Sequence, residues 1–222
     1  MIAKGEPWGH PAAGPPELVV DGSDDALAQA VAAHHGARIG FQPAPGSDFA
    51  RAVGLTRGGA QDTDLLCDAL DVVLDETHGD TVALVAVNVV VVGVAPDRQH
   101  WWSRAPGMQV TVDDRVVHEG AATGVVIANG QYLRGNDVVP RGHPGDGRIE
   151  VQVYSIARLE RRALRGRVRD ATHLPHPRIR LASGRRVEVR GAPRGVEVDG
   201  VSAGRARTVA VAVAPAAFTL LV

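Results

Sequence analysis

Residues 125–153 read VVIANGQYLRGNDVVPRGHPGDGRIEVQV, and this stretch carries most of the information about the fold. Two runs of mostly β-branched and aliphatic residues, 125–128 and 149–153, flank a connection that is rich in Gly, Asn, Asp and Pro. This order is typical of a strand, an ordered loop and a second strand. The stretch therefore predicts a β-rich domain around it.

The chain from Thr81 onward repeats the same texture on either side of this stretch. Short apolar runs alternate with turn pairs such as Asp113-Asp114 and Asp199-Gly200. We predict strands over 81–94, 109–118, 124–129, 149–155, 179–181, 186–190, 195–198, 208–213 and 218–222, with one helix over 156–167. Many short strands separated by frequent turns indicate a β-sandwich.

The front of the chain alternates strand and helix instead. We predict strands over 17–20 and 40–42, a helix over 24–35, and a helix that begins after Ser47 as its N-cap. A further amphipathic helix is predicted over 62–76, where apolar residues recur at helical spacing. The predicted fold class is therefore α+β in two parts. A reduced α/β (Rossmann-like) N-terminal portion occupies residues 1–78, and a larger C-terminal β-sandwich occupies residues 79–222.

Composition narrows the class of protein. The single cysteine, Cys67, excludes an internal disulfide framework, suits a reducing cytosol and is predicted to be a core residue. The chain has no apolar run of about 18 residues and no signal-peptide pattern at its start, so a cytoplasmic protein is expected. Lys4 is the only lysine, which leaves none for a Walker A loop or a Schiff base.

Charge is distributed unevenly along a chain of formal net charge -1. Residues 156–190 contain 11 arginines against three acidic residues. Such a segment could bind a lipid or an anionic membrane surface, or it could be a solvated helix face and strand edge. The chain has no nucleic-acid-binding motif and only 4% aromatic residues, so nucleic acid is not an expected partner.

Several short motifs lie in a fixed order along the chain. They are Val19-Val20-Asp21-Gly22-Ser23, Ala44-Pro45-Gly46-Ser47-Asp48-Phe49-Ala50-Arg51, Asn129-Gly130, Asp146-Gly147 and Val198-Asp199-Gly200-Val201. Together they resemble the diacylglycerol kinase and sphingosine kinase-type family of lipid kinases. The corresponding family motifs are Gly-Gly-Asp-Gly-Thr, Gly-Thr-Gly-Asn-Asp-Phe-Ala-Arg, Asn-Gly, a Pro loop ending in Asp-Gly, and Asp-Gly-Glu.

This resemblance implies ATP and Mg²⁺ as cofactors and a lipid hydroxyl as phosphate acceptor. The residues that it places at the nucleotide are Asp21, Gly22, Ser23, Gly46, Ser47 and Asp48. It also implies a structural magnesium held by the carboxylate of Asp146 and the main-chain carbonyls of His143 and Arg148. Oxygen ligands of this kind suit a hard cation, whereas an Asp-Gly turn that binds no metal is the alternative.

The family motifs are altered where the chemistry would take place. Valines replace the two leading glycines, Pro45 replaces a threonine, Val201 stands where the family has its glutamate base, and Asp24-Asp25 add two carboxylates. Two functions stay open. One is an ATP-dependent lipid phosphotransferase with Asp199 or Asp21 as the base. The other is a non-catalytic homologue that binds a lipid, a nucleotide or a protein partner.

The chain is also shorter at its N-terminus than the family it resembles. The resemblance implies a strand–helix–strand section before the first motif, for which this sequence has no room. An edge left open in this way would favour a homodimer.

Overall fold

The structure, a computed structural model, describes residues 8–59, 62–76 and 80–222. In this part of the chain most residues are in strands and few are in helices. The helices are α1 (Asp24–Ala33), α2 (Asp48–Val53) and α3 (Arg161–Arg169). The strands are β1 (Gly9–Pro11), β2 (Leu18–Gly22), β3 (Arg38–Pro43), β4 (Thr63–Glu76), β5 (Thr81–Ala86), β6 (Val89–Gly93), β7 (Gly107–Val112), β8 (Arg115–Ala121), β9 (Gly124–Ala128), β10 (Tyr132–Leu133), β11 (Asn136–Asp137), β12 (Ile149–Tyr154), β13 (Ile179–Gly184), β14 (Arg186–Val198) and β15 (Val201–Leu221).

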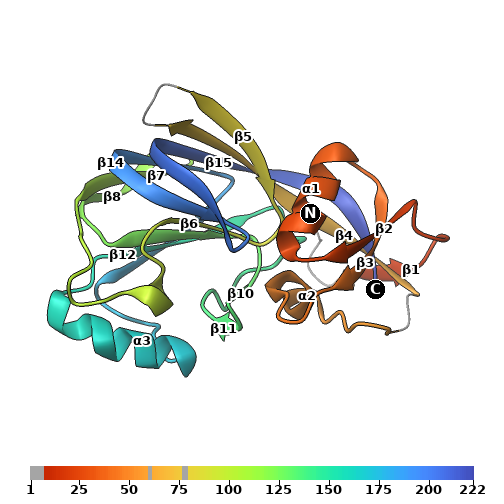
Figure 1. Cartoon of the computed structure of the whole chain (residues 1–222), viewed down its shortest axis with the longest axis horizontal. Coiled ribbons are helices and arrows are strands. Elements are labelled where there is room, and N and C mark those ends of the chain that lie inside the picture. Colours follow the sequence, from red (N-terminus) through yellow and green to blue (C-terminus); the bar gives the residue numbers. More distant parts are fainter. Residues whose placement is uncertain (1–7, 60–61, 77–79) are drawn as a thin grey trace.

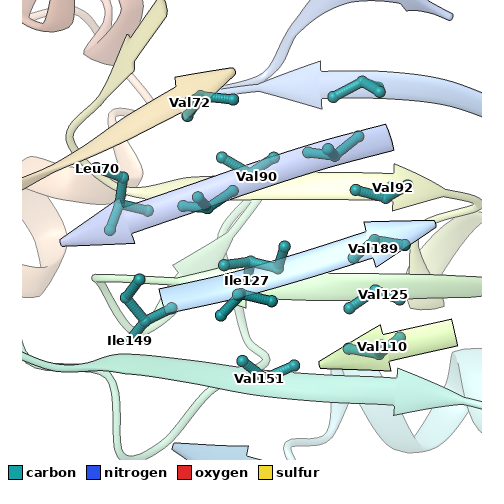
Figure 2. Packing of buried hydrophobic residues seen from close by; sticks show 14 of the residues in the cluster. Leu70, Val72, Val90, Val92, Val110, Val125, Ile127, Ile149, Val151 and Val189 are labelled. Atoms are coloured by element: carbon teal, nitrogen blue, oxygen red, sulfur yellow. The ribbon is translucent and has the colours of Figure 1, made fainter. Parts of the chain in front are cut away.

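The larger part of the molecule is a β-sandwich, as predicted (Figure 1). The hydrogen-bonded path runs β1-β4-β15-β14-β6-β9-β12-β13, with β5 paired to β4 and the β7–β8 hairpin paired to β14. Side chains from β4, β7, β14 and β15 meet those of β6, β9 and β12 in one apolar core. Figure 2 shows this core, with Val90, Ile127 and Val151 on one layer and Val72 and Val189 on the other.

The valine-rich strands β6, β9 and β12 have apolar residues on both faces. Val90 and Val125 point into the sandwich core, while their neighbours Val91 and Val126 pack in a second cluster under α3. Leu164 of α3 belongs to that second cluster. Because both faces are covered, these strands read as unbroken apolar runs rather than as alternating ones.

The front portion contains a parallel strand pair joined by a helix. Strands β2 and β3 run parallel, α1 connects them, and β3 pairs in parallel with the end of β15. Leu27 of α1, Phe41 of β3 and Phe49 of α2 pack in a core of their own with Phe218 of β15. Ser47 is the N-cap of α2, as predicted, because its Oγ atom accepts from the N–H group of Ala50. Ser23 caps α1 in the same way, through the N–H group of Ala26.

The amphipathic helix predicted over 62–76 is wrong, because these residues form strand β4. Leu65, Cys67 and Ala69 pack in the front core, whereas Leu70, Val72 and Leu74 pack in the sandwich core. The buried apolar side chains are therefore at odd positions before residue 70 and at even positions from residue 70 onward. This change of face makes Ala69-Leu70 an adjacent buried pair, and the exposed Leu66 and Val73 complete the pairs that imitate the spacing of a helix.

Several other predicted elements have different bounds. The two strands predicted over 186–198 are one strand, β14, and those over 208–222 belong to β15, which begins at Val201. The strand predicted over 81–94 divides into β5 and β6 at Val87-Asn88. Cys67 is buried as predicted, although on a strand. Among the helices of the described residues, none is long and apolar enough to cross a membrane.

Two long strands connect the front portion to the sandwich. β4 and β15 pair antiparallel from Leu221↔Asp64 to Ala206↔Glu76, with irregularities on either side of the 208–214 segment. Each strand contributes residues to both cores. The relative position of the two portions is therefore fixed by main-chain hydrogen bonds rather than by a flexible linker.

Candidate functional site

A cleft of about 190 Å³ lies where the front portion meets the sandwich. One side is formed by Ser23-Asp24 and the loop 44–48, and the other side by residues 88–89, 133–134 and 199–200. Figure 1 shows α2 beside the β10–β11 hairpin at this junction. Parts of three sequence motifs, namely Ser23, the loop 44–48 and Asp199-Gly200, therefore converge on one place.

Asp24, the first residue of α1, is held against the start of α2. Its carboxylate accepts hydrogen bonds from the Ser47 hydroxyl and from the N–H groups of Asp48 (3.1 Å) and Phe49 (3.0 Å). Burial raises the pKa of Asp24, and the hydrogen bond from Ser47 opposes that rise. The N–H groups in the first turn of a helix have no partner within the helix and commonly bind anions. In this protein the Asp24 carboxylate accepts those of Asp48 and Phe49.

Asp199 lies in the two-residue turn between β14 and β15. Its carboxylate accepts from three successive N–H groups, those of Val87 (2.7 Å), Asn88 (3.0 Å) and Val89 (2.8 Å). The residue is buried, and burial raises its pKa to about 7 against the lowering effect of the three hydrogen bonds. The charge of Asp24 raises the pKa of Asp199 further. Asp199 therefore fixes the β5–β6 connection to the turn.

The raised pKa of Asp199 gives a testable pH dependence. The folded state holds the proton on this carboxyl more tightly than the unfolded chain does. The contribution of the protonated Asp199 carboxyl to the free energy of unfolding is therefore complete below the unfolded pKa of about 3.9. It is lost as the pH rises through about 7. Relative to Asp199→Asn, the wild-type protein should lose up to about 1.4 kcal/mol of unfolding free energy per pH unit between pH 5 and 7. Urea denaturation of both proteins across this range measures the difference, and a constant difference would contradict the assignment.

Arg134 is the only basic residue among the residues that line the cleft in the described part of the chain. Its guanidinium pairs with Asp97 (2.7 Å) and with Glu197, which also pairs with Arg98 (3.3 Å). Burial lowers the pKa of Arg134, but the hydrogen bonds and charges of the two carboxylates raise it above its ordinary value. Its positive charge is thus matched by carboxylates on both sides.

The loop before β11 is tied to α2 by two side chains. The Asp48 carboxylate accepts from the N–H groups of Arg134 and Gly135 (2.7 Å for the latter). The Arg51 guanidinium donates to the Gly135 carbonyl (2.6 Å) and lies over the ring of Tyr132 (5.0 Å to its centroid). Asp48, Asp24 and Asp199 thus place three carboxylates around the cleft, each engaged with main-chain N–H groups.

The residues that the resemblance assigns to the nucleotide do not all face this cleft. Ser23, Gly46, Ser47 and Asp48 line it, together with Pro45, while Asp21 and Gly22 do not. The Asp21 carboxylate is exposed and pairs with Arg57 (2.9 Å). A second, more open groove of about 440 Å³ lies on the other side of the loop 44–47, between α2 and Arg57. The roles of the six predicted nucleotide residues, Asp21, Gly22, Ser23, Gly46, Ser47 and Asp48, stay predictions.

Asp24, Asn88 and Arg134 line the cleft but are not among the site residues that the sequence predicts. In the sequence, Asp24 and Asp25 are departures from the family motif, and acidic residues in the first turn of a helix are ordinary. The side-chain amide nitrogen of Asn88 donates to the Tyr132 carbonyl (3.0 Å). The side-chain oxygen of Asn88, Oδ1, is buried without a hydrogen-bond partner. No local pattern links these residues, because each meets its partner across the fold.

The predicted magnesium ligands lie together in one turn outside the cleft. The Asp146 carboxylate accepts from the Arg148 N–H (2.9 Å), and the His143 carbonyl accepts from the N–H groups of Gly145 (2.9 Å) and Asp146 (3.4 Å). The neighbouring carboxylate of Asp68 is already used by the N–H groups of Gly147 (2.6 Å) and Ala216 (2.9 Å).

Among the described residues no group of three or more His, Cys, Asp or Glu side chains could hold a metal ion. One carboxylate and two carbonyls would leave about half of an octahedral coordination shell to waters, which Mg²⁺ commonly retains. The magnesium site at His143, Asp146 and Arg148 therefore stays a prediction, and no step is derived through the ion.

Comparisons with known proteins agree with this architecture. Residues 98–222 match the YegS C-terminal NAD kinase beta sandwich-like domain. A comparison with curated proteins found no match. Among solved structures, a diacylglycerol kinase from Bacillus anthracis str. Sterne aligns with a TM-score of 0.66 and 15% identity, over 92% of this chain and 76% of that chain.

A candidate diacylglycerol kinase from the same organism aligns with a TM-score of 0.71 and 15% identity, over 92% of this chain and 78% of that chain. The yeast NADH kinase complexed with NADH aligns with a TM-score of 0.54 and 11% identity, over 92% of this chain and 61% of that chain. At these identities the solved structures show the fold alone. Since the family match extends over more than half of the chain, the protein belongs to the family of the YegS C-terminal NAD kinase beta sandwich-like domain.

Proposed function

We propose that this protein is a non-catalytic member of its lipid kinase-like family, with a front portion that descends from the family's α/β (Rossmann-like) nucleotide-binding part. The observation that carries the proposal is the Asp24 carboxylate, which occupies the N–H groups at the start of α2. A phosphate of ATP would have to displace this carboxylate or lie beside it. Like charges at such short range repel strongly where water is excluded.

The size and charge of the cleft support the same proposal. Small-molecule sites are commonly cavities of roughly 300–1,000 Å³, and the cleft has about 190 Å³. Its one guanidinium, that of Arg134, is already paired with two carboxylates. A polyphosphate would therefore meet an acidic, narrow cleft without a free cation to offset its charge.

The contacts of the two carboxylates considered as a base also support the proposal. Asp199 uses both oxygens to hold three main-chain N–H groups. Asp21 is paired with Arg57 and does not line the cleft. Val201, at the position of the family's glutamate, is 49% exposed and has no proton-accepting group. A general base must reach the hydroxyl that it deprotonates.

ATP binding and phosphate transfer test the proposal directly. In calorimetry with and without Mg²⁺, we expect no binding of ATP tighter than about 1 mM, which corresponds to about 4 kcal/mol. With radiolabelled ATP and mixed diacylglycerol and sphingoid vesicles, we expect no labelled lipid, with an active lipid kinase assayed in parallel. Micromolar ATP binding or labelled lipid would overturn the proposal.

The variant Val201→Glu separates two reasons for inactivity. If only the base were missing, a glutamate at this exposed position would start phosphate transfer. We expect Val201→Glu to stay inactive, because the cleft itself is closed to the nucleotide by Asp24 and its partners. Transfer by this variant would mean that ATP does enter the cleft.

A further inference from the structure

Three large apolar side chains project into solvent at one end of the sandwich. Leu159 is 95% exposed, Trp101 65% and Trp102 60%. We call them the Trp–Leu patch. Leu159 lies in a single 3₁₀ turn just before α3, and the two tryptophans follow the 3₁₀ turn Pro96–Arg98, against which α3 packs. Figure 1 shows α3 at the end of the sandwich that is distant from α1 and β2.

One buried arginine holds the main chain that carries the two tryptophans. The Arg161 guanidinium donates to the carbonyls of Ile156 (3.2 Å), Trp101 (3.3 Å) and Ser103 (2.6 Å). It also donates to the carbonyl of His100 (3.3 Å). The segment that carries the tryptophans is therefore fixed to the start of α3. Because the main chain of this segment is positioned before any partner arrives, little main-chain ordering entropy is lost on binding.

The aromatic rings of this segment also support one another. The imidazole of His100 stacks on the indole of Trp102 with 4.4 Å between centroids and 7° between planes. Trp101 meets Trp102 edge-on at 5.5 Å and 87°. One face of Trp102 is covered, and the two indoles are not parallel. This arrangement is a poor platform for stacking successive bases of a nucleic acid, but it leaves apolar edges free to enter a lipid interface.

The surface around the patch is strongly basic. Residues 156–169 contain six arginines and one glutamate, and Glu160 is paired with Arg178 (3.4 Å). Leu164 and Val168, on the inner face of α3, are buried. The exposed arginines are Arg158, Arg162, Arg167 and Arg169. Arg104 is exposed beside the tryptophans. Exposed apolar side chains thus stand among positively charged side chains, on a chain of formal net charge -1.

We propose that the Trp–Leu patch and the exposed arginines of residues 158–169 dock this protein on an anionic phospholipid bilayer. Indole rings favour the headgroup region, where one edge is apolar and the other is wet. Leu159 enters the acyl boundary, and the guanidinium groups bind lipid phosphates in the bidentate way that arginine favours. A protein partner would need an interface of roughly 1,000 Å² or more, which three side chains do not provide. This docking is independent of phosphate transfer and of the cleft.

Vesicle binding without ATP tests the proposal. We expect cosedimentation with phosphatidylcholine vesicles that contain about one third phosphatidylglycerol, a blue shift of tryptophan emission on binding, and little binding to phosphatidylcholine alone. Leu159→Ser should weaken binding about tenfold, since it removes one fully inserted aliphatic side chain. Arg158→Gln and Arg162→Gln should each weaken binding about fivefold, and raising the salt concentration should weaken it further.

Matched variants elsewhere on the surface are the controls. Leu181→Ser changes an exposed leucine of β13 outside the patch, and Arg207→Gln changes an exposed arginine of β15. Both should bind vesicles like the wild-type protein. The proposal is overturned if anionic vesicles are not bound, if Leu159→Ser binds as the controls do, or if single-stranded nucleic acid removes the protein from the vesicles at equal charge concentration.

Discussion

Asp199→Ala lowers the free energy of unfolding by roughly 3–5 kcal/mol, the largest effect that we expect from a single substitution in the cleft. The carboxylate satisfies three buried N–H groups in a row, those of Val87, Asn88 and Val89. Each N–H left without an acceptor costs about 1–3 kcal/mol. Since a domain of this kind is stable by only about 5–15 kcal/mol, the variant should be close to unfolding at moderate temperature. Urea denaturation monitored by circular dichroism measures the loss.

Asp113→Ala is the matched control for that substitution. Asp113 has a φ of 44°, Asp199 a φ of 45°, and each is the first residue of a two-residue hairpin turn. The Asp113 carboxylate also accepts main-chain hydrogen bonds, from Arg185 and Arg186, but it does so in solvent (both 2.9 Å). Water can replace these bonds, so the loss should be about 1 kcal/mol. Equal losses for the two variants would mean that burial of Asp199 contributes nothing.

Gly142→Ala lowers the free energy of unfolding by roughly 3 kcal/mol, for a steric reason. A Cβ atom at residue 142 would lie far inside van der Waals contact with the main-chain carbonyl of Gly130 and close to the N atom of Gln131. Main-chain atoms of a hydrogen-bonded loop cannot move aside as the end of a side chain can. Thermal unfolding of the variant should show a lower midpoint, with the same secondary structure at low temperature.

Gly107→Ala is the control for the glycine substitution. Nothing lies within 4 Å of the position that a Cβ atom would take at residue 107, which is exposed at the start of β7. This variant should be as stable as the wild-type protein, or slightly more stable, because alanine restricts the unfolded chain. If Gly142→Ala were as stable as Gly107→Ala, the two loops would not be packed main chain to main chain.

The close approach of Gly142 to Gly130 explains why the opening stretch of sequence identifies the fold. Asn129 adds to it, because its side-chain amide donates to the carbonyls of Asp68 and Val87 (both 2.9 Å). The Asn-Gly pair therefore joins β9, β4 and the β5–β6 connection at one point. These are requirements of packing, and they hold whether or not the protein transfers phosphate. The preserved motif thus indicates the architecture and carries no information about catalysis.

The sequence by itself determined the β-sandwich, the turns at Asp113 and Asp199, the N-cap at Ser47 and the family. Each of these depends on local chemistry, namely residue order, turn propensity or a short motif. Only the tertiary structure decided that residues 63–76 are a strand, because β4 changes its buried face between Ala69 and Leu70. Only the tertiary structure placed Asp24 on the N–H groups of Asp48 and Phe49, some 25 residues along the chain. Contacts of this range depend on how two cores share their strands, and no local pattern encodes them.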